Sequence, residues 1–270
     1  MIIVSAATGE YGRLVVDQLL NRVQASEIGV AVRNPAAAAD LAARGVDVRR
    51  GDYDDPESLR QAFRGADRLL FISSPTFDSS QRMPQHHNVL AAARDVGVGV
   101  LAYTGALGAD VSDEGGLADH HATERAIVDS ELAYTILRHP IYSDFFLNAG
   151  LRDAVERGEI TSSTKGRGLN TATRADLAAA AAVVLTGDGH ASRAYDFAGP
   201  LWTYPELAGL LSELSGRTVT YREVDADEGM MEMIGPAIRL GQFERQTDDL
   251  ERILGRPPTS LRASVVAAMT

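Results

Sequence analysis

Small residues fill a short segment near the amino terminus, from Ser5 to Gly9. Three apolar residues, 2–4, precede this segment, and apolar residues at helical spacing follow it at Leu14, Val15, Leu19 and Leu20. A strand that enters a small-residue loop and then opens a helix is typical of a site for dinucleotide phosphates, because the amides and the dipole at the helix start hold negative charge. An ordinary tight turn is the alternative, since a Gly-rich turn alone is weak evidence. The context on both sides favours the nucleotide site.

Two glycines and one alanine define how this loop would work. Gly9 would let the backbone approach a pyrophosphate, and Gly12 would let the helix pack closely on the strand. Ala6 stands where the first glycine of such a loop is usual, so the loop must accept a Cβ near the phosphates.

Arg33 follows the second apolar run of the chain, Ile28 to Val32. A site that prefers NAD has an acid at this position, whereas a planar cation suits the 2′-phosphate of NADP, which it can bind with two hydrogen bonds. A solvated surface arginine is the alternative. Asp52 could orient the adenine amino group, or it could cap the turn before Tyr53. We therefore expect NADP(H) as the cofactor.

Lys165 is the only lysine of the chain, and Thr161 stands four residues before it. Dehydrogenases that reduce carbonyls with a Tyr and a Lys four residues later use the cation to lower the pKa of the phenol, and this pair cannot exist here. Arginine does not replace it easily, because its charge is fixed and its geometry differs. An acceptor such as a quinone takes hydride at carbon and a proton from solvent. We therefore expect no obligate catalytic acid or base, and hydride transfer by positioning.

Histidines occur as two adjacent pairs, His86-His87 and His120-His121. Adjacent residues on a helix point about 100° apart, so neither pair can chelate one metal on one face. The run HHATE lacks the Glu directly after the first His that a zinc-protease helix requires, and we expect no metal. Capping or a polar site wall is the role we favour for these histidines.

Aromatic residues gather after the sixth apolar run, at Tyr142, Phe145 and Phe146. This position suits a flat aromatic substrate, and ordinary core packing is the alternative.

Composition narrows the function classes. The chain has 270 residues, a formal net charge of −11 and no cysteine. The negative charge argues against nucleic acid or an anionic membrane as the main partner. The absence of cysteine excludes disulfides, zinc thiolates and a thiol nucleophile. We see no leader peptide and no apolar run near the ~18 residues of a membrane span, so we expect a cytoplasmic protein.

Short apolar strands alternate with single helices through the first half of the chain, with strands expected at 2–4, 28–32, 46–48, 69–72, 98–103 and 134–137. This alternation predicts an α/β protein with a Rossmann-type doubly wound parallel sheet. Beyond about residue 145 it loosens into a helix at 174–185, a strand at 195–198, a helix at 204–214, a strand at 219–221 and helices to the end. We expect a dinucleotide-binding domain over 1–145 and a smaller substrate-side α/β lobe over 146–270, which shares the sheet edge and does not fold alone.

Ligands of such sheets lie outside the carboxyl ends of the strands, where the strand order reverses. This rule selects the polar or small residues directly after each apolar run: Thr8, Gly9, Arg33, Asp52, Ser73, Ser74, Thr104, Gly105 and the segment 140–142.

Nine runs of the sequence resemble the NmrA-like atypical short-chain dehydrogenase/reductase family, and especially its branch of type 2 NAD(P)H:quinone oxidoreductases and triphenylmethane reductases. They are SAATGEYG, AVRNP, GDYDDPESL, LLFISSP, LAYTG, LADHHATE, YTILRHPIYSDFF, TRADLAAAA and LGRPPTSL. The resemblance covers nearly the whole chain. It implies an NADP-binding Rossmann domain, a small carboxyl-terminal lobe, and a cleft between them for quinones or triphenylmethane dyes. It is compatible with a homodimer.

The resemblance also implies roles for individual residues. The pyrophosphate would lie against Ala6, Ala7, Thr8, Gly9, Glu10 and Tyr11, and the 2′-phosphate against Arg33. Ser73 and Ser74 would line the ribose side, and the nicotinamide would be flanked by Pro140, Ile141, Tyr142, Ser143 and Asp144. The substrate-side aromatics would be Phe77, Tyr142 and Phe146. The sequence departs from the family at Ala6 and at His139-Pro140, where related chains have Asn and a small residue.

Three functions fit these observations. The first is an NADPH-dependent reductase of quinones or similar conjugated aromatic acceptors. The second is a non-catalytic regulator that senses NADP(H), and the third is an isomerase or dehydratase that uses the nucleotide only structurally. Turnover with a quinone panel would separate the first from the second.

Overall fold

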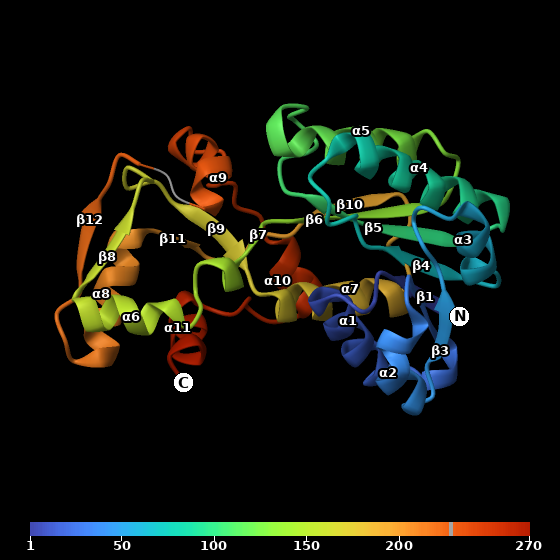
Figure 1. Ribbon diagram of the computed structural model, residues 1–270, viewed down its shortest axis with the longest axis horizontal. Coiled ribbons are helices and arrows are strands. Elements are labelled where there is room, and N and C mark those ends of the chain that lie inside the picture. Colours follow the sequence, from blue (N-terminus) through green and yellow to red (C-terminus); the bar gives the residue numbers. More distant parts are fainter. Residues whose placement is uncertain (227–228) are drawn as a thin grey trace. The chain divides into compact units, whose positions relative to one another are not determined.

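The structure is a computed structural model that describes residues 1–226 and 229–270, and its largest sheet has seven parallel strands (Figure 1). In chain order its strands are β1 (Ile2–Ser5), β2 (Ile28–Val32), β3 (Asp47–Arg50), β4 (Arg68–Phe71), β5 (Val100–Ala106), β6 (Tyr134–His139) and β10 (Arg193–Asp196). Their spatial order is β10-β6-β5-β4-β1-β2-β3. The chain therefore changes direction across the sheet between β1 and β4, which is where such folds bind ligands.

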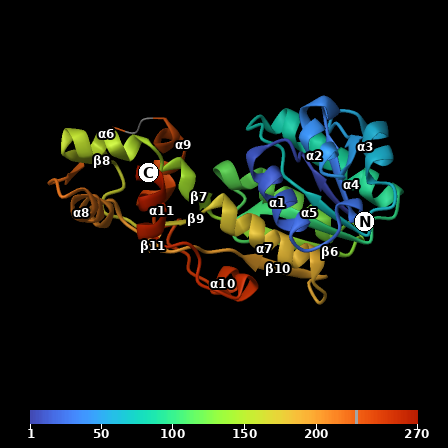
Figure 2. The ribbon, with the colours of Figure 1, turned by 90° about the horizontal axis from the view of Figure 1, so that it is seen from below.

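Helices cover both faces of this sheet (Figures 1 and 2). One face carries α3 (Pro56–Phe63), α4 (Ser79–Asp95) and α5 (Ala118–Val128), and the other carries α1 (Glu10–Leu20) and α7 (Arg174–Thr186). Beside α1, a 3-10 turn (Pro35–Ala38) leads into the short α2 (Ala39–Ala43). The apolar strands are buried on both faces, and Phe71 and Tyr103 pack with the α3 and α4 side chains Leu59, Phe63 and Val89. The predicted Rossmann-type α/β fold is confirmed.

The sequence predicts a helix from His87 to Val96, whereas helix α4 begins eight residues earlier, at Ser79. Asp78 caps it by accepting a hydrogen bond from the Ser80 amide, and Pro84 lies within its second turn. A proline at that place normally ends a helix, so its first turns looked like loop in the sequence.

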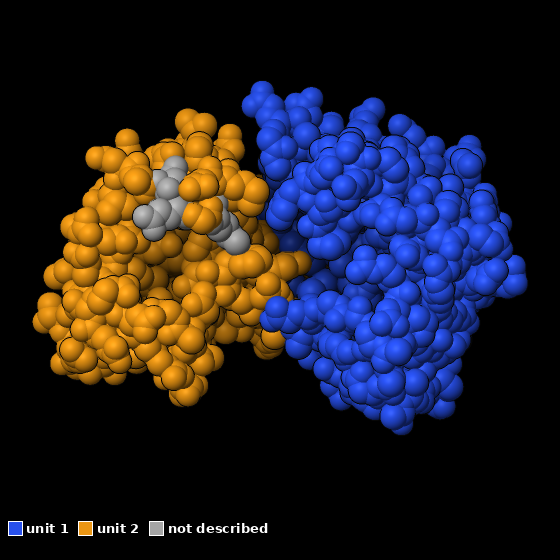
Figure 3. Space-filling view, in the orientation of Figure 1, with its two compact units in different colours: residues 1–139, 177–196 blue, residues 140–176, 197–270 orange. Residues whose placement is uncertain are grey.

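The chain forms two compact units, drawn in blue and orange in Figure 3. The first unit contains residues 1–139 and 177–196, and the second contains residues 140–176 and 197–270. This division differs from the predicted boundary at residue 145. We expected β10 to belong to the smaller lobe and to lie at the sheet edge. It does lie at the edge, but it belongs to the first unit. It pairs with β6, from Arg193 opposite Thr135 to Asp196 opposite Arg138. The edge strand was misassigned because its first two residues are exposed and carry no apolar pattern.

The second unit has two small sheets of its own. One contains β7 (Ile141–Tyr142), β9 (Leu169–Ala172) and β11 (Leu201–Trp202), and the other contains β8 (Glu159–Ser162) and β12 (Thr220–Glu223). The helices of this unit are α6 (Gly150–Arg157), α8 (Tyr204–Ser215), α9 (Met230–Arg239), α10 (Asp249–Leu254) and α11 (Leu261–Met269). The sequence missed β7, α6, β8, β9 and β11. Its prediction of helices after residue 221 also covers residues 227 and 228, which lie outside the described residues.

Candidate functional site

The loop between β1 and α1 has the backbone that a phosphate site needs. Gly9 is the N-cap of α1 and has no side chain to occupy the amides of the first turn. A Cβ on Gly9 would have its nearest neighbour at 3.4 Å, the Ala6 oxygen, so the protein itself leaves room there. A Cβ on Gly12 would lie 2.7 Å from the Ala7 Cα, which confirms that Gly12 permits the close packing of α1. The two glycines therefore serve different purposes.

Ala6 stands in place of the usual first glycine and adopts a strained backbone conformation. Its φ is +50°, in the left-handed region that favours glycine. The Ala6 amide donates to the Ala31 oxygen of β2 (2.9 Å), and its oxygen accepts from the Gly9 amide (3.1 Å). These bonds hold the alanine in the glycine conformation and tie the loop to β2.

Arg33 directly follows β2, and its side chain is exposed. Two other arginines of the first unit pair with acids: Arg13 with Asp40 and Arg50 with Asp55. Arg33 has no ion pair or hydrogen bond to any residue that the structure describes. The exposed guanidinium of Arg33 is thus available at the end of β2, the strand to which the Ala6 amide bonds.

Asp52 fulfils one of its two predicted roles. Its Oδ1 accepts a hydrogen bond from the Asp54 amide (3.2 Å), so it caps the turn that contains Tyr53. The contact with adenine stays a prediction.

Polar groups at the ends of β1, β4 and β5 bond to one another. The Tyr53 hydroxyl lies 2.5 Å from Ser5 Oγ and donates to the Ile72 oxygen (2.7 Å), while the Ile72 amide donates to Ser5 Oγ (3.0 Å). The Ser73 amide donates to Thr104 Oγ1 (2.9 Å). Ser73 and Thr104, selected separately from the sequence, therefore lie side by side.

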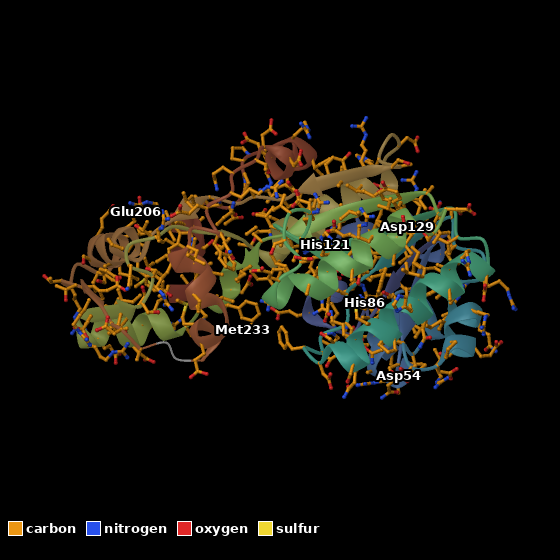
Figure 4. The ribbon with its side chains drawn as sticks, turned by 90° about the horizontal axis from the view of Figure 1, so that it is seen from above. Asp54, His86, His121, Asp129, Glu206 and Met233 are labelled. Carbon is orange, nitrogen blue, oxygen red and sulfur yellow. The ribbon has the colours of Figure 1, made fainter. Side chains whose placement is uncertain are left out.

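Ser74 is held from behind by α4. Its amide donates to His86 Nε2 (3.0 Å) and its hydroxyl donates to Gln85 Oε1 (2.5 Å), and Gln85 in turn donates to the Asp54 carboxylate. Figure 4 labels His86 and Asp54. Ser74 is only 4% exposed, and its hydroxyl is committed to α4. This arrangement argues against the predicted ribose contact by its side chain and favours a positioning role.

The histidines belong to a polar seam between α4 and α5, formed by Arg82, His86, Tyr103, His120 and Thr123. Because His86 Nε2 accepts from an amide, its Nδ1 carries the proton and donates to Thr123 Oγ1 (2.8 Å). Arg82 likewise donates to His120 Nε2 (2.7 Å), and His120 Nδ1 donates to the Tyr103 hydroxyl (2.8 Å). Burial lowers the pKa of both His86 and His120 to about 3. The sequence suggested a polar wall but missed Arg82 and Gln85, which share one helix face with His86.

Glu124 of the HHATE run forms an ion pair with Arg138 of β6, in which Glu124 Oε2 lies 2.7 Å from Arg138 Nη2. Arg138 also donates to Asp196 of β10 (3.0 Å). Burial raises the pKa of Glu124. The cluster joins α5 to the sheet edge. Among the residues that the structure describes, no group of three or more His, Asp or Glu could hold a metal ion, and no helix could cross a membrane.

His139 ends β6 and directly precedes the segment predicted to flank the nicotinamide. Its ring is buried and meets the Tyr11 ring edge-on, with centroids 5.2 Å apart, and burial lowers its pKa to about 3. The departure from the family at this position thus makes contact with the first turn of α1.

In the second unit, residues 140–146 divide between surface and core. Pro140 and Ser143 are buried, and Ser143 donates to Thr171 Oγ1 (3.0 Å). Phe146 meets Trp202 edge-on at 6.0 Å within the core of this unit, which favours the packing alternative for Phe146. Phe145, by contrast, is 47% exposed. In the first unit Phe77 is 77% exposed, so it is available for the predicted substrate contact.

A family model described as NAD(P)H-binding matches residues 6–188. The chain belongs to this family. It is also 39% identical to Quinone oxidoreductase 2 of Escherichia coli (strain K12) over 98% of its length and 97% of the relative's. The predicted NmrA-like family, NADP(H) as the family's cofactor, and the oxidoreductase class are confirmed at this level.

Two solved structures resemble the whole chain. The triphenylmethane reductase of Citrobacter sp., complexed with NADP(H), has a TM-score of 0.94 and 42% identity, with 99% of this chain and all of that one covered. The NADPH-dependent quinone oxidoreductase of Escherichia coli, complexed with NADPH, has a TM-score of 0.92 and 37% identity, and both chains are covered fully.

Proposed function

We propose that the protein is an NADPH-dependent reductase that passes hydride directly to a quinone or a similar conjugated aromatic acceptor, such as a triphenylmethane dye. The observation that carries the cofactor choice is the exposed Arg33 without a partner at the end of β2, the strand to which Ala6 ties the phosphate loop. The names of the two similar structures support the acceptor class.

Each predicted residue then has a binding role. The loop of residues 6–11 binds the pyrophosphate through backbone amides other than those of Ala6 and Gly9, which bond to the Ala31 and Ala6 oxygens. Arg33 donates two hydrogen bonds to the 2′-phosphate. Asp52 faces the adenine, and Ser73 and Thr104 face the ribose, with Ser74 held behind them. Residues 140–144 flank the nicotinamide, and Phe77 and Tyr142 contact the acceptor. Phe146 packs against Trp202 in the core of the second unit.

NADPH supplies the hydride when it is bound. The protein orients the two reactants and excludes water, and solvent supplies the proton that a reduced quinone takes up. The described residues agree with a reaction that needs no acid or base from the protein. The Tyr103 side chain is fully buried and its hydroxyl bonds to His120, while the histidines of the polar seam are neutral and hydrogen-bonded.

Purified protein mixed with NADPH and a panel of quinones tests the proposal. We expect the absorbance of NADPH to fall only when an acceptor is present. Tight NADPH binding without turnover of any acceptor would contradict the reductase and support a regulator that senses the nucleotide. The cytoplasmic location, a homodimer and the assignment of the second unit to substrate binding stay predictions.

A further inference from the structure

Gln85 of α4 bonds to two loops that follow different strands of the large sheet. Its Nε2 donates to both carboxylate oxygens of Asp54, at 3.0 Å and 3.1 Å, and its Oε1 accepts from the Ser74 hydroxyl (2.5 Å). Asp54 belongs to the loop after β3, and Ser74 belongs to the loop after β4. One side-chain amide therefore joins the two loops.

Hydrogen bonds extend this link in both directions. At one end, the Asp54 amide donates to Asp52 Oδ1 (3.2 Å). At the other end, Ser74 follows Ser73, whose amide donates to Thr104 Oγ1 (2.9 Å). The link thus runs from the residue proposed for adenine to the two residues proposed for ribose.

The two loops serve opposite halves of the dinucleotide in the proposed function. In the spatial order of the sheet, β2 and β3 lie on one side of β1, whereas β4 and β5 lie on the other. A dinucleotide lies across the point where the strand order reverses, with one half on each side. Because Arg33 and Asp52 receive the adenosine half, Ser73 and Thr104 receive the nicotinamide half.

Other side chains of α4 hold the backbone of the same loops. His86 Nε2 accepts from the Ser74 amide (3.0 Å), and Asn88 Nδ2 donates to the Tyr53 oxygen (2.9 Å). His86 is buried, whereas Asp54 is exposed. A nucleotide at this loop can therefore reach the Asp54 carboxylate and, through the α4 glutamine that bonds to it, influence the loop after β4.

We propose that Gln85 is a positioning residue that couples the two halves of the cofactor. Adenosine bound at the adenine loop (residues 52–54) orders the ribose loop (residues 73–74) through Gln85, and this raises the rate of hydride transfer. The inference rests on the proposed function, in which these loops bind NADPH. Binding energy from the half of the cofactor that does not react is thus used to place the half that does.

A cofactor supplied in two pieces tests the coupling. Reduced nicotinamide mononucleotide carries the same hydride as NADPH but lacks the adenosine half, which adenosine 2′,5′-bisphosphate provides separately. With a naphthoquinone as acceptor, we expect saturating adenosine 2′,5′-bisphosphate to raise kcat/KM for the mononucleotide about tenfold in the unmodified protein. No increase, in a protein that turns over NADPH, would overturn the coupling and leave the reductase function intact. Absence of turnover with NADPH itself would instead overturn the reductase function.

Gln85→Glu breaks the link with little change in shape. A carboxylate at this place still accepts from Ser74, but it cannot donate to Asp54, and the two like charges repel. We expect the stimulation by adenosine 2′,5′-bisphosphate to fall below about twofold. Gln81→Glu is the matched control, because Gln81 lies one turn earlier with an exposed side chain and donates to Asp78, outside both loops. Equal loss of stimulation in both variants would overturn the proposal.

Two further variants separate the link from a general effect on folding. Asp54→Asn combined with Gln85→Glu exchanges donor and acceptor, so we expect the stimulation to return to about tenfold. Ser74→Ala removes the other end of the link without altering the adenine loop. We expect it to abolish the stimulation while its affinity for adenosine 2′,5′-bisphosphate, measured by calorimetry, stays within about twofold.

These two variants also decide the question if Gln85→Glu does not fold. Stimulation that persists in Ser74→Ala would overturn the proposal. A folded double variant that does not regain the stimulation would overturn it as well.

Discussion

Two parts of the sheet edge differ in how their charged and polar groups are bonded: the carboxyl ends of β1 and β2, and the carboxyl ends of β4 and β5. After β2, Arg33 is exposed and without an ion pair among the described residues. After β4, Ser74 donates both of its protons to α4, and His86 and His120 are bonded through both ring nitrogens. One half of the edge keeps its donors available for a ligand, and the other uses them to hold a loop in place. Four predictions test this contrast.

The polar seam should make the protein sensitive to acid. The folded-state pKa of both His86 and His120 is about 3, below the ordinary 6.5, so the unfolded chain binds more protons between these values and stability falls as the pH falls through them. We expect each histidine to cost about 2 kcal/mol near pH 5 relative to pH 7. Urea unfolding at the two pH values measures this.

Replacement of His86 by Gln should remove about half of this pH dependence, although it lowers stability at pH 7. His87→Gln is the control, because His87 lies on the same helix with an exposed side chain. Equal loss of stability with acid in both variants would show that the seam is not the acid-sensitive element.

Replacement of Gly9 and replacement of Gly12 by alanine should have different effects. Gly12→Ala places a Cβ 2.7 Å from a backbone carbon, so we expect a loss of about 3 kcal/mol in unfolding free energy. Gly9→Ala meets only ordinary contacts and has φ −71°, so we expect less than about 1 kcal/mol. Its cost should appear in NADPH affinity, measured by calorimetry. A Gly9→Ala protein that binds NADPH normally would remove Gly9 from the phosphate site.

Loss of Arg33 should affect NADPH far more than NADH. We expect Arg33→Ala to weaken NADPH binding by about 30-fold, or about 2 kcal/mol, because a charge-assisted pair with the 2′-phosphate is lost. NADH affinity and thermal stability should not change. Arg22→Ala, which removes another exposed arginine of the first unit, controls for net charge. Equal weakening of both nucleotides would contradict the 2′-phosphate site.

Ala6→Gly should have the smallest effect. A glycine adopts φ +50° without strain, but it also gives the unfolded chain more freedom. We expect the unfolding free energy to rise by no more than about 0.5 kcal/mol, with NADPH affinity unchanged. A gain above about 2 kcal/mol would mean that the hydrogen bonds of Ala6 do not offset its strain.

The sequence was most informative where a pattern is local. Runs of three to six mostly apolar residues predicted the first six strands, and the small residues of 5–9 with Gly12 predicted the loop that opens α1. Arg33 could be selected because its position directly after a strand has a known chemical meaning. These features need no knowledge of distant residues.

The features that the sequence did not reveal depend on partners far apart in the chain. Arg174 reaches Tyr142 across 32 positions, and Arg82 reaches His120 across 38. For His86 we expected capping or a polar site wall, but its partners, the Ser74 amide and the Thr123 hydroxyl, lie in the interior on other elements. Strand β10 was assigned to the wrong unit because its pairing partner β6 is far away in the chain, and the two exposed residues that begin β10 show no apolar pattern.

The return of β10 to the sheet has a consequence for synthesis of the chain on the ribosome. The nucleotide-binding unit cannot be completed when residue 139 has emerged, since its edge strand and the buried face of α7 come from residues 177–196. Until then β6 exposes an unpaired backbone edge, and the helix layer beside α1 is unfinished. A gene cut at residue 145 would therefore yield an aggregating fragment and not a small autonomous NADP-binding protein.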